Sequence, residues 1–211
     1  SVTGVQTCAL PISLVALIAP FAFLAWQFFQ VFTDPLSDAM GTDPVAYIHH
    51  FLGDTAIRIL LITLAISPIR DITGWAPIAL IRRRIGLAAF FYAALHMVAY
   101  LWLDKNWDLG LLWEDMVIRT YIMLGMAALV LMIPLAVTSN NSVIRRLGRK
   151  TWDRVHWLIY PLAILAVAHN LLMVKIIYGD PLIHAIILTL LLGWRVARWV
   201  LGKLNAPAAA A

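Results

Sequence analysis

Long apolar stretches separated by short polar segments dominate the pattern of this chain. Several of these stretches approach the ~20 consecutive apolar residues that a helix needs to cross a bilayer. The pattern therefore predicts an all-α fold, a single bundle of six transmembrane helices. The six predicted helices span residues 14–32, 50–69, 82–103, 117–137, 151–174 and 181–201.

The two ends of the chain differ from this predicted membrane domain, which covers residues 14–201. Residues 1–13 begin without Met and lack the basic segment that opens a signal peptide, so we expect an atypical or artefactual N-terminus. Residues 202–211 are small and Ala-rich, and we expect them to form a disordered tail.

Composition supports a membrane protein and excludes several classes of site. At 63% hydrophobic and 13% charged residues, the chain is too apolar for a soluble domain of 211 residues. The single cysteine, Cys8, excludes an intrachain disulfide and cysteine-ligated zinc or iron–sulfur centres. The net charge of +5 comes from basic residues at helix ends, which indicates membrane topology and no nucleic-acid binding. No GxGxxG or Walker pattern marks a nucleotide site.

The basic residues are unequally divided between the two sides of the predicted spans. One side holds twelve and the other three, while Arg58 lies within a span. By the positive-inside rule the richer side faces the cytoplasm, and six spans then place both termini there. The twelve are Arg70, Arg82, Arg83, Arg84, Arg145, Arg146, Arg149, Lys150, Arg154, Arg195, Arg198 and Lys203; the three are Lys105, Arg119 and Lys175.

Three of the histidines within the predicted spans lie away from the outer helix ends. His156 and His169 lie thirteen positions apart on one predicted helix, ~20 Å of helix rise, and His96 lies on another. Ionisable residues inside membrane helices are costly and usually functional, and imidazole is a standard axial ligand of haem iron. Pro161 lies between the first two and can kink their helix, so their relative phase stays open.

Two of these histidines are predicted to lie at the same depth. His96 lies twelve residues past Arg84, ~18 Å from the inner border, and His169 lies fifteen past Arg154, ~22 Å from it. Both helices run from inside to outside. We therefore predict that His96 and His169 are the two axial ligands of one b-type haem in the outer half of the membrane.

His156 lies near the inner face, two residues past Arg154, with no histidine partner at its level. It is the predicted axial ligand of an inner haem, if a second haem binds, so the sequence predicts one or two haems. Arg82 stands fourteen positions before His96 on nearly the same helix face. It is either an unusual opposite ligand or a partner of a haem propionate, and both interpretations stay open.

The remaining polar residues in or near the spans have competing interpretations. Arg58 either extends to the surface and pairs with Asp54 or neutralises an outer haem propionate. His49, His50 and His184 lie at outer helix ends, where we expect structural or partner-facing roles. No HxxxH or HExxH pattern marks a zinc site.

Several segments of this sequence resemble the MsrQ family, also called YedZ, within the ferric reductase and NADPH oxidase transmembrane superfamily. Members of that superfamily carry two histidines on each of two helices, and here Arg82 takes the place of one of them. The similarity extends over about residues 14 to 200. At Leu52 this sequence differs from the family, which usually has Thr there. The resemblance implies a ferric reductase or cytochrome b-like bundle. The matching segments are Asp43–Gly53, Arg83–Leu87 with Phe90–His96, Leu135–Ser139, and Arg145–Gly148 with Trp152, His156, Tyr160 and His169.

The resemblance implies an electron relay in the bacterial inner membrane. Electrons would come from the quinone pool or a cytoplasmic flavin reductase and pass through haem b. They would leave to the periplasmic molybdenum-containing subunit MsrP, which reduces methionine sulfoxide in oxidised periplasmic proteins. The substrate chemistry is thus expected on the partner. Some members of the family bind FMN, and no residue of this sequence marks that site.

Two other interpretations stay open at this stage. A ferric reductase or NADPH oxidase-like protein would need a flavin and nicotinamide domain, which this chain lacks, although a separate reductase could supply the electrons. A non-redox transporter or scaffold would have helices broken at mid-membrane, for which Pro161 and Gly125 are the candidates. A colourless purified protein would favour the transporter or scaffold.

Overall fold

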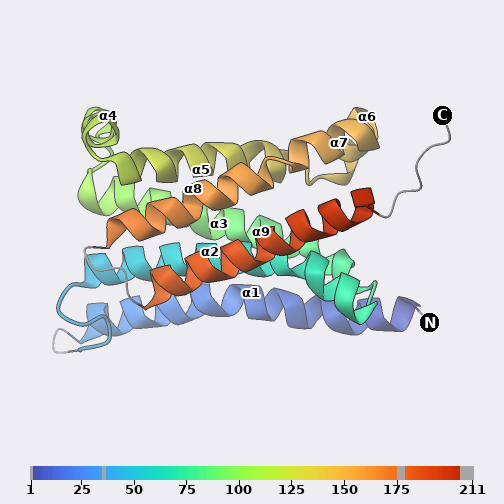
Figure 1. Ribbon diagram of the computed structural model, residues 1–211. Helices are drawn as coiled ribbons and strands as arrows, with labels where there is room; N and C mark the ends of the chain where they lie inside the picture. The colour runs from blue at the N-terminus through green and yellow to red at the C-terminus, as the bar shows by residue number, and fades with distance from the viewer. Residues whose placement is uncertain (1, 35–36, 175–178, 205–211) are drawn as a thin grey trace.

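The computed structural model describes residues 2–34, 37–174 and 179–204, and all regular elements in these ranges are helices. The all-α prediction is therefore confirmed for this part of the chain. The long helices lie side by side along one common direction, with the short helix α4 at one end of the bundle and α6 and α7 at the other (Figure 1). In chain order they are α1 (Val2–Thr33), α2 (Pro44–Thr73), α3 (Ile78–Ala99), the π-helix η1 (Tyr100–Asp104), α4 (Leu109–Ile118), α5 (Thr120–Val137), α6 (Asn141–Leu147), α7 (Arg149–His156), α8 (Ile159–Met173) and α9 (Asp180–Leu204).

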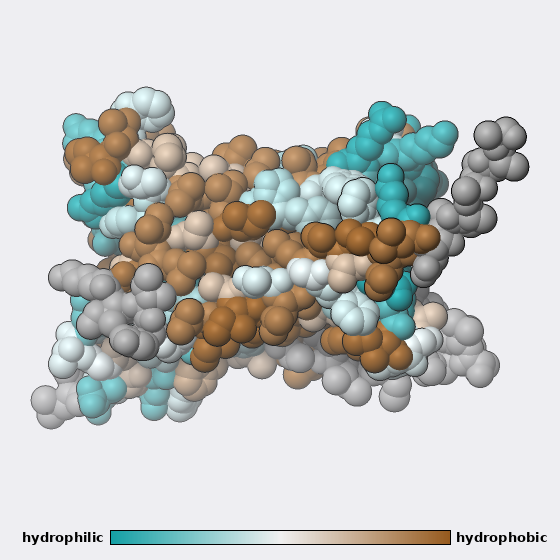
Figure 2. Space-filling view, viewed as in Figure 1, coloured by the Kyte–Doolittle hydropathy of each residue, from teal (hydrophilic) through white to brown (hydrophobic). Residues whose placement is uncertain are grey.

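Within the described residues, five segments are long and apolar enough to cross a membrane. Apolar residues cover the middle of the molecule, while hydrophilic residues gather at its two ends, as Figure 2 shows. These are the features of a multi-pass membrane protein. The first predicted span lies within α1, where Leu17–Thr33 is a shorter apolar segment. The five spans are Pro44–Thr73, Ile81–Asp104, Thr120–Val137, Arg149–Met173 and Asp180–Leu204.

Helix α2 is the central helix and is longer than predicted at both ends. It begins at Pro44 because the Asp43 side chain caps it by accepting a hydrogen bond from the Ala46 amide at 3.0 Å. The predicted end at residue 69, directly after Pro68, is wrong. Proline lacks the amide that would pair with the Leu64 carbonyl, but Arg195 of α9 donates to that carbonyl at 2.8 Å, and the helix continues to Thr73.

The segment predicted as an outer loop after residue 103 contains an additional helix, α4. Asp108 accepts hydrogen bonds from the amides of Gly110 and Leu111 at 2.7 and 3.2 Å, which fixes the start of this helix. Ten residues are too few for a membrane span, which is why the apolar pattern alone missed it.

The helix predicted over residues 151–174 is divided into α7 and α8 by a tight turn at Trp157 and Leu158. Pro161 has no amide for the Trp157 carbonyl, which accepts instead from the amide of Tyr160 at 3.2 Å. Such three-residue turns rotate about 120° per residue rather than 100°. The turn therefore changes the angle between His156 and His169 from that of a straight helix.

Helix α1 is attached to the bundle through Tyr92 of α3, one of the most buried side chains. The Tyr92 hydroxyl donates to the Leu17 carbonyl at 2.7 Å and accepts from the Phe21 amide at 3.1 Å, two groups that would otherwise pair within α1. Helix α1 begins, and α9 ends, at the end of the bundle that carries α6 and α7 (Figure 1). The tail predicted at 202–211 lies outside the described residues from 205 on, while residues 202–204 belong to α9.

Candidate functional site

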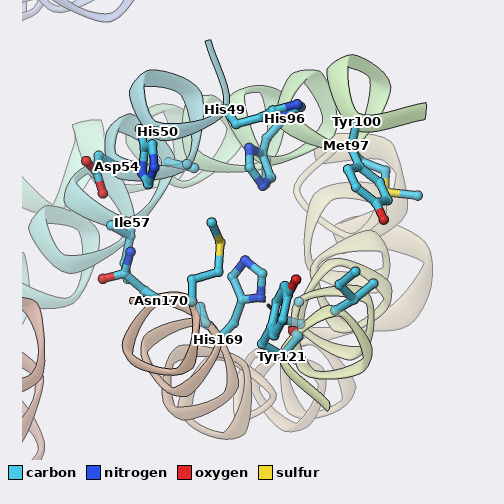
Figure 3. Close-up of a pocket in the computed structure, with 18 of the residues that line it drawn as sticks. His49, His50, Asp54, Ile57, His96, Met97, Tyr100, Tyr121, His169 and Asn170 are labelled. Atoms are coloured by element: carbon cyan, nitrogen blue, oxygen red, sulfur yellow. Dashed lines mark hydrogen bonds between the residues drawn. The ribbon is translucent and has the colours of Figure 1, made fainter. Parts of the chain in front are cut away.

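A cavity of about 530 Å³ lies between α2, α3, α5 and α8, toward the end of the bundle that carries α4. We call it the outer cavity, following the predicted orientation. Figure 3 shows His49 and His96 on one side of a central hollow and His169 on the opposite side. Its deeper wall is apolar, with Ala93 and Leu129 among the lining residues.

The structure brings the predicted pair His96 and His169 together across this cavity. Their ring centroids are 6.3 Å apart, and the ring planes are inclined at 73°. They come from α3 and α8, and their proximity agrees with the common level that residue counting predicts.

A backbone carbonyl fixes the tautomer of His169. The Nδ1 atom of its ring donates to the carbonyl of Tyr121 at 2.6 Å, and a carbonyl can only accept. The lone pair of a neutral ring is then on Nε2, the arrangement that histidine ligands of metals usually adopt. Nδ1 of His96 is buried, and among the described residues it has no hydrogen-bond partner.

Each of the two rings packs against a glycine of a neighbouring helix. An ideal Cβ at Gly125 of α5 would lie 2.8 Å from Nδ1 of His169, closer than real Cβ contacts come. An ideal Cβ at Gly53 of α2 would lie 3.4 Å from Cε1 of His96, which is a close but tolerable contact. The absence of a side chain at Gly125 therefore creates the space that His169 occupies.

The outer cavity fits a haem held between two histidines. With metal–nitrogen bonds of about 2 Å, two axial imidazoles have their centroids about 6 Å apart, which agrees with the observed 6.3 Å. In the part of the chain described, no group of three or more His, Cys, Asp and Glu side chains is placed to hold an ion. Two histidines alone suit a metal whose other ligands belong to a cofactor.

His49 lines the outer cavity and contacts its other residues, which its position at a helix end did not predict. Its Nε2 donates to Asp104 at 2.6 Å, and its ring lies edge-on to that of His96, with centroids 5.8 Å apart. Sequence reasoning missed this contact because residues 49 and 104 meet only when α2 packs on α3. His184 instead donates from Nδ1 to Asn170 at 3.2 Å and is buried, as its expected structural role requires.

Arg58 does not join the outer cavity. Its Nη2 atom pairs with Asp180 of α9 at 2.6 Å, and both side chains are about half exposed. The alternative partner Asp54 lines the cavity, but Arg58 is not among the lining residues. The geometry thus gives no support to contact between Arg58 and a haem propionate.

A buried carboxylate, Asp115 of α4, ties the outer ends of the helices together. It contacts Lys105 and the Tyr100 hydroxyl, and Nε of Arg119 lies 3.6 Å away. The contacts with Lys105 first, and with Tyr100 second, lower the pKa of Asp115 below its ordinary value. The ionised carboxylate therefore holds α4 against η1 and the start of α5.

Asp115→Asn is expected to reduce thermal stability near neutral pH. Because the pKa of Asp115 is lower in the folded protein, its contribution is complete above its unfolded pKa of about 3.9 and is lost as the pH falls through the folded value. Thermal unfolding in detergent should show a Tm loss of a few degrees at pH 7, at about 2–4 °C per kcal/mol, that shrinks below pH 4. Glu114→Gln, an exposed neighbour, is the control. An equal loss at every pH would contradict the ion-pair explanation.

A second cavity, of about 720 Å³, lies toward α6 and α7, and we call it the inner cavity. His156 lines it, and its Nδ1 donates to the Trp152 carbonyl at 3.1 Å, which leaves the lone pair of a neutral ring on Nε2. The Trp152 ring stacks on His156, with centroids 3.8 Å apart. Arg82 lines the same cavity, so the structure brings together the two residues predicted for the inner level.

The two cavities are neighbours separated by three apolar side chains. Leu60 of α2, Met132 of α5 and Leu162 of α8 line both cavities and are all buried. Groups bound in the two cavities would thus be separated by one layer of side chains.

Comparison with known proteins agrees with this architecture. A family model described as the ferric reductase like transmembrane component matches residues 52–167. A protein of Xanthomonas campestris pv. campestris is 50% identical over 181 residues, which covers 86% of this chain and 82% of the relative. A Xanthomonas axonopodis pv. citri protein has the same identity and coverage.

A more distant relative, from Azospira oryzae, is 41% identical over 172 residues, or 81% of this chain and 73% of the relative. All three relatives are named protein-methionine-sulfoxide reductase heme-binding subunit MsrQ. The resemblance drawn from the sequence segments is confirmed. The chain therefore belongs to the MsrQ family, within the ferric reductase-like transmembrane proteins.

Proposed function

We propose that this protein is the membrane electron-transfer subunit of a methionine sulfoxide reductase system and binds haem b between His96 and His169. The observation that carries the proposal is the facing pair of rings, 6.3 Å between centroids, across a largely apolar cavity. The name of the relatives, heme-binding subunit, supports the same cofactor.

The chain's own residues bind and orient the cofactor. Nε2 of His96 and Nε2 of His169 are the proposed axial ligands, and the Tyr121 carbonyl holds the His169 ring in the required tautomer. Haem supplies a centre that accepts and releases one electron at a time. The apolar wall, including Ala93 and Leu129, excludes water and favours a low local dielectric.

We assign a second haem to the inner cavity, with His156 as one axial ligand. The support is the free Nε2 of His156 and the size of the cavity, about 720 Å³. The layer of Leu60, Met132 and Leu162 would then keep the two sites close together and dry. Two sites at successive depths provide a path for electrons across the membrane.

The proposed setting is the bacterial inner membrane, with six spans and both termini in the cytoplasm. The shared location of the start of α1, the end of α9 and the basic helices α6 and α7 supports this orientation (Figure 1). Electrons would enter from the quinone pool or a cytoplasmic flavin reductase, with FMN as a further candidate cofactor. They would leave to a periplasmic molybdenum-containing subunit, MsrP, where methionine sulfoxide is reduced.

The test is a dithionite-reduced minus oxidised visible spectrum of the purified protein, with haem quantified per chain. We expect a sharp b-type α band and a ratio near two. A protein made with adequate haem supply that shows no haem band would overturn the proposal and favour a transporter or scaffold.

His156→Ala is expected to lower the haem content by one per chain and to leave the outer haem in place. The reason is that His156 lines only the inner cavity, on the far side of the layer formed by Leu60, Met132 and Leu162. Haem per chain and the number of transitions in a redox titration measure this effect. Unchanged haem content in His156→Ala would rule out His156 as a ligand.

A further inference from the structure

The inner cavity has an unusual concentration of guanidinium groups. Four arginines from α3, α7 and α9 line it, while Asp153 is the one carboxylate among the described lining residues. Asp153 is already engaged, because Arg149 donates to both of its oxygens at 3.2 Å. In the described part of the chain, Arg82 and Arg195 form no ion pair with a carboxylate. The four arginines are Arg82, Arg83, Arg149 and Arg195.

The guanidinium of Arg195 is held in place by contacts that leave most of its donors unused. Its Nη2 donates to the Leu64 carbonyl that Pro68 leaves free, at 2.8 Å, and Nη1 donates to the Leu191 carbonyl at 3.3 Å. The group also lies over the Tyr160 ring, 5.5 Å from the centroid. Guanidinium has five N–H donors, so, within the described part of the chain, three remain for another acceptor. A fixed planar group with free donors is well suited to bind a carboxylate.

Arg82 approaches the same cavity from α3. It donates one long hydrogen bond within the described part of the chain, from Nη1 to the Ser67 hydroxyl at 3.4 Å, and its side chain is half-buried. Arg70, then Arg195 and Arg149, are close enough to act on Arg82 electrostatically, and the last two line the same cavity. Like charges brought together in a partly desolvated cavity repel one another, and an anion bound between them would remove that cost.

We infer that Arg82 and Arg195 together bind the carboxylate groups of the haem assigned to the inner cavity. This inference rests on the proposed function and gives the inner cofactor its orientation, with its iron toward His156 and its carboxylates toward the two arginines. It selects one of the two interpretations of Arg82 drawn from the sequence. It also adds Arg195, which the charge pattern alone marked only as a basic residue at a helix end.

The test compares three variants of the full-length protein on helix α9. Arg195→Gln removes the charge but keeps a side-chain amide that can donate to the Leu64 carbonyl, which protects the fold. Arg195→Lys keeps the charge. Arg198→Leu is the matched control, because Arg198 is three residues further along, more than half exposed, and does not line the inner cavity; its Nη2 lies 3.9 Å from Oδ2 of Asp71.

Haem per chain and the midpoint potential of the inner haem are the readouts, with the inner transition identified by its loss in His156→Ala. Removing a cation beside the carboxylates disfavours the reduced state. We expect Arg195→Gln to shift the oxidised-to-reduced ratio about tenfold toward the oxidised form, about 59 mV for a one-electron couple. Arg195→Lys should show a smaller shift and Arg198→Leu none.

The outcomes separate this inference from the proposed function. An inner haem that keeps its content and potential in both Arg195→Gln and Arg82→Gln would overturn the carboxylate site while leaving the haem assignment intact. A wild-type protein with no inner haem would contradict the proposed function before any variant is compared. A purified protein that holds flavin in place of the inner haem, and loses it in Arg195→Gln, would show that the arginines bind a phosphate and would overturn the carboxylate assignment.

Discussion

His169→Ala is expected to remove the outer haem completely, a loss of one haem per chain. The variant removes one of two facing rings and leaves no other imidazole of the described residues at that position, because His49 and His50 both lie across the hollow from His169 (Figure 3). His96→Ala should have the same effect, since each ring supplies one of the two axial bonds. Haem per chain and the reduced α band of the purified variants measure the loss. In cells, electron delivery to the reductase should stop.

Two further variants distinguish the loss of a haem ligand from a general folding defect. His169→Met keeps a ligating side chain, so it should retain the outer haem with a raised midpoint potential. His184→Gln is the matched control, because His184 is a buried histidine that hydrogen-bonds Asn170 and lines neither cavity. Normal haem content in both His96→Ala and His169→Ala would show that the pair does not ligate haem.

Gly125→Ala should be the most damaging substitution that adds a single methyl group near the outer site. The new Cβ would lie 2.8 Å from Nδ1 of His169, and that ring is already held by the Tyr121 carbonyl. Either α5 or the ring must move. Overpacking of this kind costs about 1–3 kcal/mol, which corresponds to roughly 5- to 150-fold weaker haem binding.

Alanine substitutions at two other glycines serve as comparisons for the loss of haem binding expected in Gly125→Ala. Gly53→Ala meets His96 at 3.4 Å and should weaken haem binding only slightly, while Gly193→Ala has no atom within 4 Å and should have no effect. Haem retention during purification and the electron paramagnetic resonance signal of the oxidised haem are the measurements. Equal haem retention and equal spectra in Gly125→Ala and Gly193→Ala would contradict the role of Gly125.

Several of these features follow from the sequence because they depend on local periodicity. The lengths of the apolar stretches define the membrane helices, and the distance of His96 and His169 from the basic border defines their common depth. Depth along a helix grows by a fixed rise per residue, so counting residues is sufficient. The same counting separates His156 from His169 along the predicted helix, and in the structure the two histidines line different cavities.

Tertiary packing decided which residues of neighbouring helices contact one another, and residue counting along one helix cannot predict those contacts. The contact of His49 with Asp104 and the pairing of Arg58 with Asp180 each join residues far apart in the chain. The depth count could not reveal that Gly125 provides the space for His169, because that space depends on how α5 packs on α8.

The inner cavity shows the same difference between what the sequence predicts and what the packing of the helices determines. The sequence predicts a helix that ends at residue 69, directly after Pro68, and counts Arg195 among the basic residues of the inner side. In the folded protein Arg195 satisfies the carbonyl that Pro68 leaves free, so the helix continues and the arginine faces the inner cavity. The apolar pattern determined which segments cross the membrane, because each helix satisfies most of its own hydrogen bonds. The packing of those helices against one another decided which polar side chains meet between them.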